Sequence, residues 1–239
     1  MNGTKLLIQG INELGIQITD QQVAQFLKYY EMLVEINKVM NLTSIVDFND
    51  VITKHFIDSL LSVKTVDMEK FQTMIDVGTG AGFPGIPLKI VFPHLNVTLL
   101  DSLNKRLLFL NDVIKELKLK DICTVHGRAE DLGKNQNYRE KFDICVSRAV
   151  ANLSTLSEYC IPFISEGGKF ISYKSEFSEE EKNSAEKAID ILGGKIEKRD
   201  IVKLPYTNIN RSFIVIHKIK QTPDKYPRKA GMPLKKPLK

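Results

Sequence analysis

From residue 72 onward, short apolar runs alternate with segments of helical length, and this alternation constrains the fold more than any other feature of the chain. Parallel strands need a long crossover connection, so the alternation predicts an α/β fold with a mainly parallel sheet and helices on both faces. The last two runs are separated only by YTNIN, which is too short for a crossover helix, so they should be antiparallel neighbours. The seven runs are TMIDVG, NVTLLD, ICTVHG, FDICVSR, GKFISYK, IEKRDIVKLP and RSFIVIHKIK.

The first 66 residues have a different pattern, with apolar side chains recurring at spacings of three and four that predict helices. Thr19 or Asp20 can cap one helix, and VITKHFIDSLLSV predicts a second. The chain is therefore expected to have three parts. These are a helical N-terminal extension (1–66), the sheet domain (67–220) and a basic C-terminal tail (221–239).

The charge of the chain is unevenly distributed. The net charge is +5, but residues 218–239 hold eight Lys and Arg against one Asp, while the other 217 residues hold 26 basic and 28 acidic side chains. A short, proline-punctuated basic segment suits contact with a polyanion, although a solvated tail that aids solubility would have the same composition. Charge alone does not separate these two interpretations.

The composition excludes several other classes of protein. The sequence has no run of about 18 apolar residues that could span a bilayer, so a soluble, cytoplasmic protein without a membrane partner is expected. Cys123, Cys145 and Cys160 are odd in number and lack CxxC spacing, which argues against a disulfide framework or a zinc site. We therefore expect three buried free thiols and no bound metal.

The first predicted strand runs into DVGTGAG, a glycine loop at the strand-to-helix turn where open α/β sheets bind ligands. Gly78, Gly80 and Gly82 permit positive φ and close approach of a ligand to bare backbone. GAGFPG also matches GxGxxG, so a nicotinamide cofactor stays an alternative, whereas the lysine of a nucleotide-binding P-loop is absent. Two residues argue against a dinucleotide. Pro84 lies inside the expected start of the helix, and Asp76 places an acidic group beside the loop. An acidic group there disfavours pyrophosphate and suits a ligand that carries an ammonium and a sulfonium.

Polar residues follow the next three predicted strands. Asp101, about 20 residues beyond the loop, can accept hydrogen bonds from ribose hydroxyls. Ala129 and Glu130 follow the third strand, where an adenine ring and its amine would be recognised by backbone and side chain, and Arg148 follows the fourth. The carboxyl ends of parallel strands meet at one edge of the sheet, so these residues are expected to face one crevice.

These segments resemble the class I S-adenosylmethionine-dependent methyltransferases, with their Rossmann-like sheet. More narrowly, NLTSI, HFIDSL, IDVGTGAGFPGIPLKI, LLDSLNKR, GRAED, VSRAVA and YPRKAGMPLKKPL are similar to the bacterial rRNA small-subunit methyltransferase G family, also called glucose-inhibited division protein B. The resemblance spans nearly the whole chain. It implies transfer of a methyl group from S-adenosylmethionine to N7 of a guanine in 16S rRNA, with small-subunit rRNA or a ribosomal particle as the partner. We separately expect the enzyme to be a monomer.

Carried over by position, the resemblance implies cofactor contacts at Gly78, Phe83, Ala129, Glu130 and Arg148. The logic of the fold adds Gly80 and Asp101. A non-catalytic RNA-binding module on the same frame and a small-molecule methyltransferase are the alternatives, and the basic tail would be unnecessary for the second.

No catalytic residue is predicted, because guanine N7 has an in-plane lone pair, carries no hydrogen and needs no general base. The absence of an NPPY-like segment and of a cysteine in a loop motif agrees with N7 as the acceptor. Four polar residues of the helical extension could line the opening above the loop or simply pin the helices, and the second role is favoured. They are Asn41, Thr43, His55 and Asp58.

Overall fold

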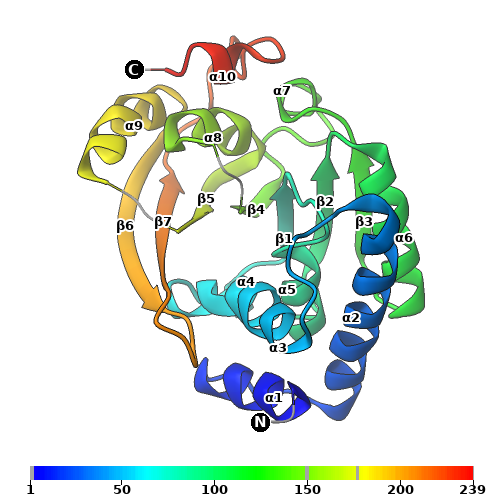
Figure 1. Ribbon diagram of the computed structural model, residues 1–239. Coiled ribbons are helices and arrows are strands. Elements are labelled where there is room, and N and C mark those ends of the chain that lie inside the picture. Colours follow the sequence, from blue (N-terminus) through cyan, green and yellow to red (C-terminus); the bar gives the residue numbers. More distant parts are fainter. Residues whose placement is uncertain (1–2, 149–150, 176–177, 239) are drawn as a thin grey trace.

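The computed structural model describes residues 3–148, 151–175 and 178–238, and its centre is a seven-stranded sheet of order β3-β2-β1-β4-β5-β7-β6 (Figure 1). β1 pairs with β2 and β4, β2 with β3, and β4 with β5, all in parallel. β7 is antiparallel to both β5 and β6, which confirms the predicted antiparallel end of the sheet. The strands are β1 (Thr73–Val77), β2 (Asn96–Asp101), β3 (Ile122–His126), β4 (Phe142–Ser147), β5 (Ile164–Lys174), β6 (Gly194–Lys203) and β7 (Asn210–Lys218).

Helices cover both faces of the sheet, as the alternating pattern predicts (Figure 1). A π-helical turn, Ile52–Ile57, connects α3 to α4 within one continuous helical stretch. The helices are α1 (Gly3–Glu13), α2 (Asp20–Met40), α3 (Phe48–Val51), α4 (Asp58–Leu60), α5 (Gly85–Val91), α6 (Asn104–Glu116), α7 (Ala129–Leu132), α8 (Leu153–Cys160), α9 (Glu179–Ile191) and α10 (Met232–Lys235).

Two hydrophobic clusters lie on opposite faces of the sheet. One cluster joins the N-terminal helices to α5 and α6, with Phe26, Phe56 and Leu88 among its buried members. The other packs α8 and α9 against the second face. The helical extension thus shares a continuous core with the sheet domain.

The start of α2 follows from its capping residues. Thr19 accepts a hydrogen bond from the backbone N–H of Gln22, whose side chain accepts one from the N–H of Thr19. This reciprocal pair is a capping box and confirms Thr19 as the N-cap. The amide of Gln22 also donates to the carbonyl of Ile90 at 2.7 Å, so the cap ties α2 to the end of α5.

Two prolines lie close together at the start of α5, and the helix accommodates both. Pro84 is the N-cap residue and Pro87 occupies the third helical position. The N–H groups of the first turn have no intrahelical acceptor, so a proline there costs no helical hydrogen bond. The N–H of Gly85, which does need a partner, donates to Asp76 Oδ2 at 2.9 Å.

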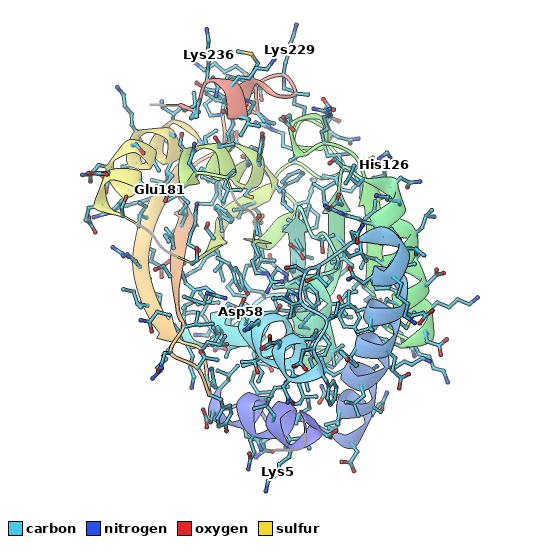
Figure 2. The ribbon with its side chains drawn as sticks, viewed as in Figure 1. Lys5, Asp58, His126, Glu181, Lys229 and Lys236 are labelled. Atoms are coloured by element: carbon cyan, nitrogen blue, oxygen red, sulfur yellow. The ribbon has the colours of Figure 1, made fainter. Side chains whose placement is uncertain are left out.

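The C-terminal residues are packed against the domain as far as residue 238. Thr222 and Tyr226 are buried, and the backbone then crosses α7 and α8 to form α10. Lys229 and Lys236 point to solvent from this segment, at the end of the molecule opposite Lys5 (Figure 2). We call residues 226–238 the C-terminal segment.

Candidate active site

The glycine loop between β1 and α5 is folded as its glycines require. Gly78, Gly80 and Gly82 all have positive φ. At Gly78, φ is 74° and a Cβ would meet nothing within 4 Å. Glycine is therefore needed here for its positive φ rather than for lack of space, and it leaves the backbone at this point open to a ligand. At Gly82 a Cβ would lie 2.6 Å from the hydroxyl of Tyr29, so this glycine also permits close packing of α2.

Asp76 supports this loop from inside the sheet. Its side chain is fully buried, and Oδ2 accepts hydrogen bonds from Thr79 Oγ1 at 2.7 Å and from the Gly85 N–H. Burial raises the pKa of Asp76 to about 7, although these two hydrogen bonds act in the opposite direction. The sequence-based expectation that Asp76 faces a cationic ligand is wrong, because side chains alternate along β1 and this one points toward α5.

Asp101 ends β2 beside the loop and is almost completely buried. Its Oδ2 accepts hydrogen bonds from the Gly80 N–H at 2.9 Å and from Arg106 at 3.3 Å, and its Oδ1 accepts one from the Leu103 N–H at 2.9 Å. A carboxylate has about four acceptor positions, so at least one remains on Oδ1. Gly80 thus contacts Asp101 directly.

Ala129 and Glu130 form the first turn of α7, directly beyond β3. Glu130 is buried, and its Oε1 accepts a hydrogen bond from the backbone N–H of Gly231 at 2.7 Å. This contact joins two positions 101 residues apart in the sequence. The sequence pattern gives no indication of it.

Arg148 follows β4 and is held by residues of the helical extension. Its guanidinium donates to Asp58 Oδ2 at 3.0 Å and to His55 Nδ1 at 3.3 Å, and lies 5.1 Å from the centre of the Phe83 ring. Asp58 is buried and also accepts from Arg211 Nε at 2.6 Å. One carboxylate therefore pairs with two arginines, Arg148 just after β4 and Arg211 in β7.

The protonation of His55 follows from these contacts. An arginine cannot supply a lone pair, so Nδ1 of His55 must accept, and Nε2 then carries the proton and donates to Thr43 Oγ1 at 2.8 Å. Burial, followed by the charge of Arg148, lowers the pKa of His55 to about 3. The ring stacks on Phe83 with centres 4.6 Å apart. The π-helical turn that presents His55 is a type of irregularity found often at functional sites.

Of the four polar residues considered in the extension, the structure brings three together with Arg148 and Phe83. They are Thr43, His55 and Asp58. Asn41 instead ends α2 as its C-cap in a left-handed conformation.

A cavity of about 540 Å³ lies at the carboxyl ends of β1, β2, β3 and β4. Five of the seven predicted residues line it, namely Gly78, Asp101, Ala129, Glu130 and Arg148. Gly80 and Phe83 are not among the lining residues, but each contacts one of them: Gly80 donates to Asp101, and the Phe83 ring lies against Arg148. The sequence did not point to the other lining residues, which include Ser147, Tyr159, Gly231 and Leu234.

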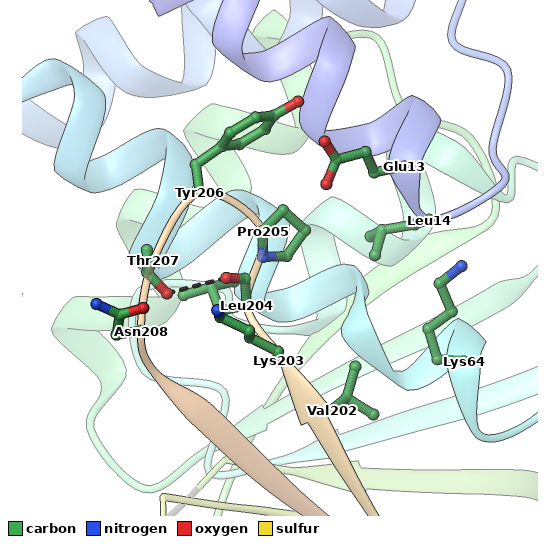
Figure 3. Close-up of a pocket in the computed structure, with 10 residues that line it drawn as sticks. All are labelled: Glu13, Leu14, Lys64, Val202, Lys203, Leu204, Pro205, Tyr206, Thr207 and Asn208. Carbon is green, nitrogen blue, oxygen red and sulfur yellow. Dashed lines mark hydrogen bonds between the residues drawn. The ribbon is translucent and has the colours of Figure 1, made fainter.

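A second hollow of about 500 Å³ lies far from this edge, between the end of α1 and the β6–β7 turn (Figure 3). Glu13, Lys64 and Tyr206 are among its lining residues, and none of the predicted site residues is. The cavity at the strand ends is therefore the candidate active site.

The described residues contain no cluster of His, Cys, Asp and Glu suited to a metal ion. All three cysteines are free, and Cys145 and Cys160 are buried as predicted. Cys123 is exposed, so the expectation of a third buried thiol is wrong. Its strand, β3, lies at the edge of the sheet, where the second neighbour that would cover it is missing. In the described part of the chain, no helix combines the length and apolar character that crossing a membrane needs.

The strand order, the antiparallel β7 and the glycine loop after β1 define a Rossmann-like class I methyltransferase fold. A ribosomal protein L11 methylase from Lactobacillus delbrueckii subsp. bulgaricus has this fold in common, with a TM-score of 0.51 at 16% identity over 70% of this chain and 79% of that one. The chain belongs to the rRNA small subunit methyltransferase G family, whose sequence profile matches residues 22–209.

Full-length relatives agree with this assignment. The ribosomal RNA small subunit methyltransferase G of Acetivibrio thermocellus is 55% identical over 98% of this chain and 96% of its own length. The protein of the same name from Alkaliphilus metalliredigens is 51% identical over the whole of both chains. By family and by fold, the chain is a methyltransferase.

Proposed function

We propose that this enzyme transfers the methyl group of S-adenosylmethionine to N7 of a guanine in 16S rRNA. The observation that carries the proposal is a pair of buried carboxylates in one cavity beside the glycine loop: Asp101 at the end of β2, and Glu130 in α7, which follows the adjacent strand β3. The family match supports rRNA as the substrate, and we accordingly expect the enzyme to work in the cytoplasm.

The residues of the cavity fit S-adenosylmethionine. A volume of about 540 Å³ lies within the range of small-molecule sites. Asp101 Oδ1 retains an acceptor position for a ribose hydroxyl, and Glu130 Oε2, which accepts no hydrogen bond from the described residues, is available for an exocyclic amine. The bare backbone at Gly78 allows close approach of the amino-acid end.

Bound S-adenosylmethionine supplies an electrophilic methyl group attached to a sulfonium. The chain then needs to align the acceptor rather than remove a proton, because guanine N7 bears none. Arg148 is placed for this, since Asp58, His55 and Phe83 fix its guanidinium at the cavity wall. A fixed guanidinium can hydrogen-bond a planar acceptor or stack on a base. His55 is neutral with both nitrogens engaged, so it is not free to act as a base.

Mass spectrometry of 16S rRNA from cells with and without the protein tests the reaction. One 7-methylguanosine should disappear in its absence and return when the intact gene is restored. An unchanged set of methylated guanosines would contradict the proposal.

Asp101→Asn tests the site. The variant removes a charged acceptor and should weaken binding of S-adenosylmethionine by about 1–3 kcal/mol, measured by calorimetric titration. Asp112→Asn, on the exposed side of α6, is the matched control and should bind normally. Tight binding of NAD by the unaltered enzyme, with none of S-adenosylmethionine, would overturn the assignment of the cofactor.

A further inference from the structure

The C-terminal segment forms part of the wall of the cavity. Gly231 and Leu234 line it together with Ala129, Glu130 and Tyr159, on the side that follows β3. Leu234 is 62% exposed, so it presents an apolar side chain at the mouth of the cavity with little protein against it. A planar ligand beside Ala129 would cover this side chain and remove apolar surface from water.

A buried ion pair fixes the path of the segment. Glu158 of α8 has no solvent exposure, and its two oxygens accept hydrogen bonds from the Arg228 side chain at 2.6–3.1 Å and from the Arg228 N–H at 2.7 Å. An unpaired carboxylate in that position would be strongly unfavourable, so Glu158 requires the segment to dock.

Further contacts hold the segment on both sides of Gly231. Arg139 donates to the carbonyl of Tyr226 at 2.8 Å. Thr155 donates to the carbonyl of Pro233 at 3.1 Å, and Ser154 to that of Leu238 at 2.5 Å. The position of Gly231 is thus set by the frame of the domain rather than by its one bond to Glu130.

Glu130 connects the segment to the site. One carboxylate oxygen is occupied by the Gly231 N–H, which orients the other oxygen and neutralises part of the buried charge. Since the same carboxylate is the one expected to meet an adenine amine, the docked segment and a bound adenosyl group share one acceptor group.

We propose that residues 231–234 of the C-terminal segment are a binding element for the adenosyl end of the cofactor, with Gly231 positioning Glu130 and Leu234 covering the purine. This inference rests on the proposed function and assigns the segment a task besides contact with RNA. If residues 231–234 bind the adenosyl group, the docked segment increases the affinity for adenosine, and bound adenosine in turn stabilises the docked segment.

A chain ending at Ala230 tests the proposal. This chain keeps the Arg228–Glu158 pair and removes Gly231 and Leu234. Its affinity for S-adenosylhomocysteine and for adenosine, measured by calorimetry, should fall by about tenfold or more and by a similar factor for both, since both carry the adenosyl group. Leu234→Asp should weaken both ligands in the same direction and leaves a folded chain, because that side chain is mostly exposed.

The matched control is the double variant Lys235→Ala and Lys236→Ala, which removes charge from the same segment at exposed positions outside the cavity lining. It should bind both ligands like the intact chain. Normal binding by the shortened chain and by Leu234→Asp would overturn the inference while the proposed function stands. If the lysine control weakens binding of both ligands as much as the shortened chain does, the inference is also overturned, because the loss of affinity would then come from the lost positive charge. If the intact chain binds neither ligand, the proposed function itself is contradicted, and with it the inference that rests on it.

Discussion

Asp76 is a fully buried carboxyl group whose hydrogen bonds compensate its charge only in part. Its Oδ2 accepts two hydrogen bonds, while Oδ1 is buried without a partner among the described residues. The pKa of Asp76 is raised to about 7, above an unfolded value of about 4. The folded chain therefore binds this proton more tightly, and the stability gained is present below pH ~4 and lost as the pH rises toward ~7.

Asp76→Asn should remove that pH dependence, because asparagine does not titrate. The unfolding free energy of the native chain should fall relative to the variant between pH ~4 and ~7, with a slope of at most about 1.4 kcal/mol per pH unit from this group. Urea denaturation at a series of pH values measures it. Parallel curves for the two proteins would contradict the raised pKa, and Asp112→Asn should give a parallel curve as control.

His55 should produce the opposite dependence. Its pKa of about 3 in the folded chain lies below the unfolded value of about 6.5, so the unfolded chain binds the proton more tightly. The stability that depends on neutral His55 is present above pH ~6.5 and is lost as the pH falls toward ~3. His55→Asn should therefore lose stability less steeply than the native chain between pH 6.5 and 4, as followed by urea denaturation. An equally steep loss in the variant would show that another group is responsible.

At the scale of helices and strands, the sequence predicted those elements that follow from local patterns of apolar and capping residues. The strand-length runs, the crossover helices and the Thr19 cap are local patterns, and the structure confirms them. Placement of Gly78, Asp101, Glu130 and Arg148 at one cavity follows from parallel topology. Gly231 and Leu234 could not be predicted in this way, because their position depends on Glu158, 70 residues from Arg228 along the chain.

Helix α2 supports the glycine loop through one hydroxyl group. Tyr29 is fully buried, donates a hydrogen bond to the carbonyl of Ala81 and lies with its ring centre 5.4 Å from that of Phe83. Tyr29→Phe leaves this carbonyl without a partner, so the unfolding free energy should fall by about 1–3 kcal/mol and binding of S-adenosylhomocysteine should weaken.

Tyr30→Phe is the control for that prediction. The Tyr30 hydroxyl donates to the carbonyl of Val46 at 3.2 Å in an exposed position, where water can replace it, so its loss should change stability by less than about 0.5 kcal/mol. Denaturation and calorimetry of both variants separate the two hydroxyls. Equal changes in stability and in ligand binding for the two variants would show that the hydrogen bond from Tyr29 to the loop contributes no more than an exposed one.

For the whole molecule, the basic C-terminal residues differ in how much of their charge reaches the surface. Lys218 and Arg228 are used internally, paired with Glu140 and Glu158, and do not contribute free charge to the surface. Lys229 and Lys236 are exposed at the end of the molecule that carries the candidate active site (Figure 2). Fewer side chains than composition suggests therefore carry free positive charge, and Lys229 and Lys236 carry it at the end of the molecule that holds the cavity.

These exposed lysines should set the salt dependence of RNA binding. If Lys229, Lys235 and Lys236 contact phosphates, changing all three to alanine should reduce the slope of log affinity against log salt by about 2, since each contact contributes ~0.7–0.9. A 16S rRNA transcript and filter binding at several salt concentrations measure the slope. A control set elsewhere on the molecule, Lys5, Lys28 and Lys38 to alanine, removes the same net charge. An equal change in slope for both sets would mean that RNA senses only net charge, whereas a larger change for the C-terminal set would place the phosphate contacts beside the cavity.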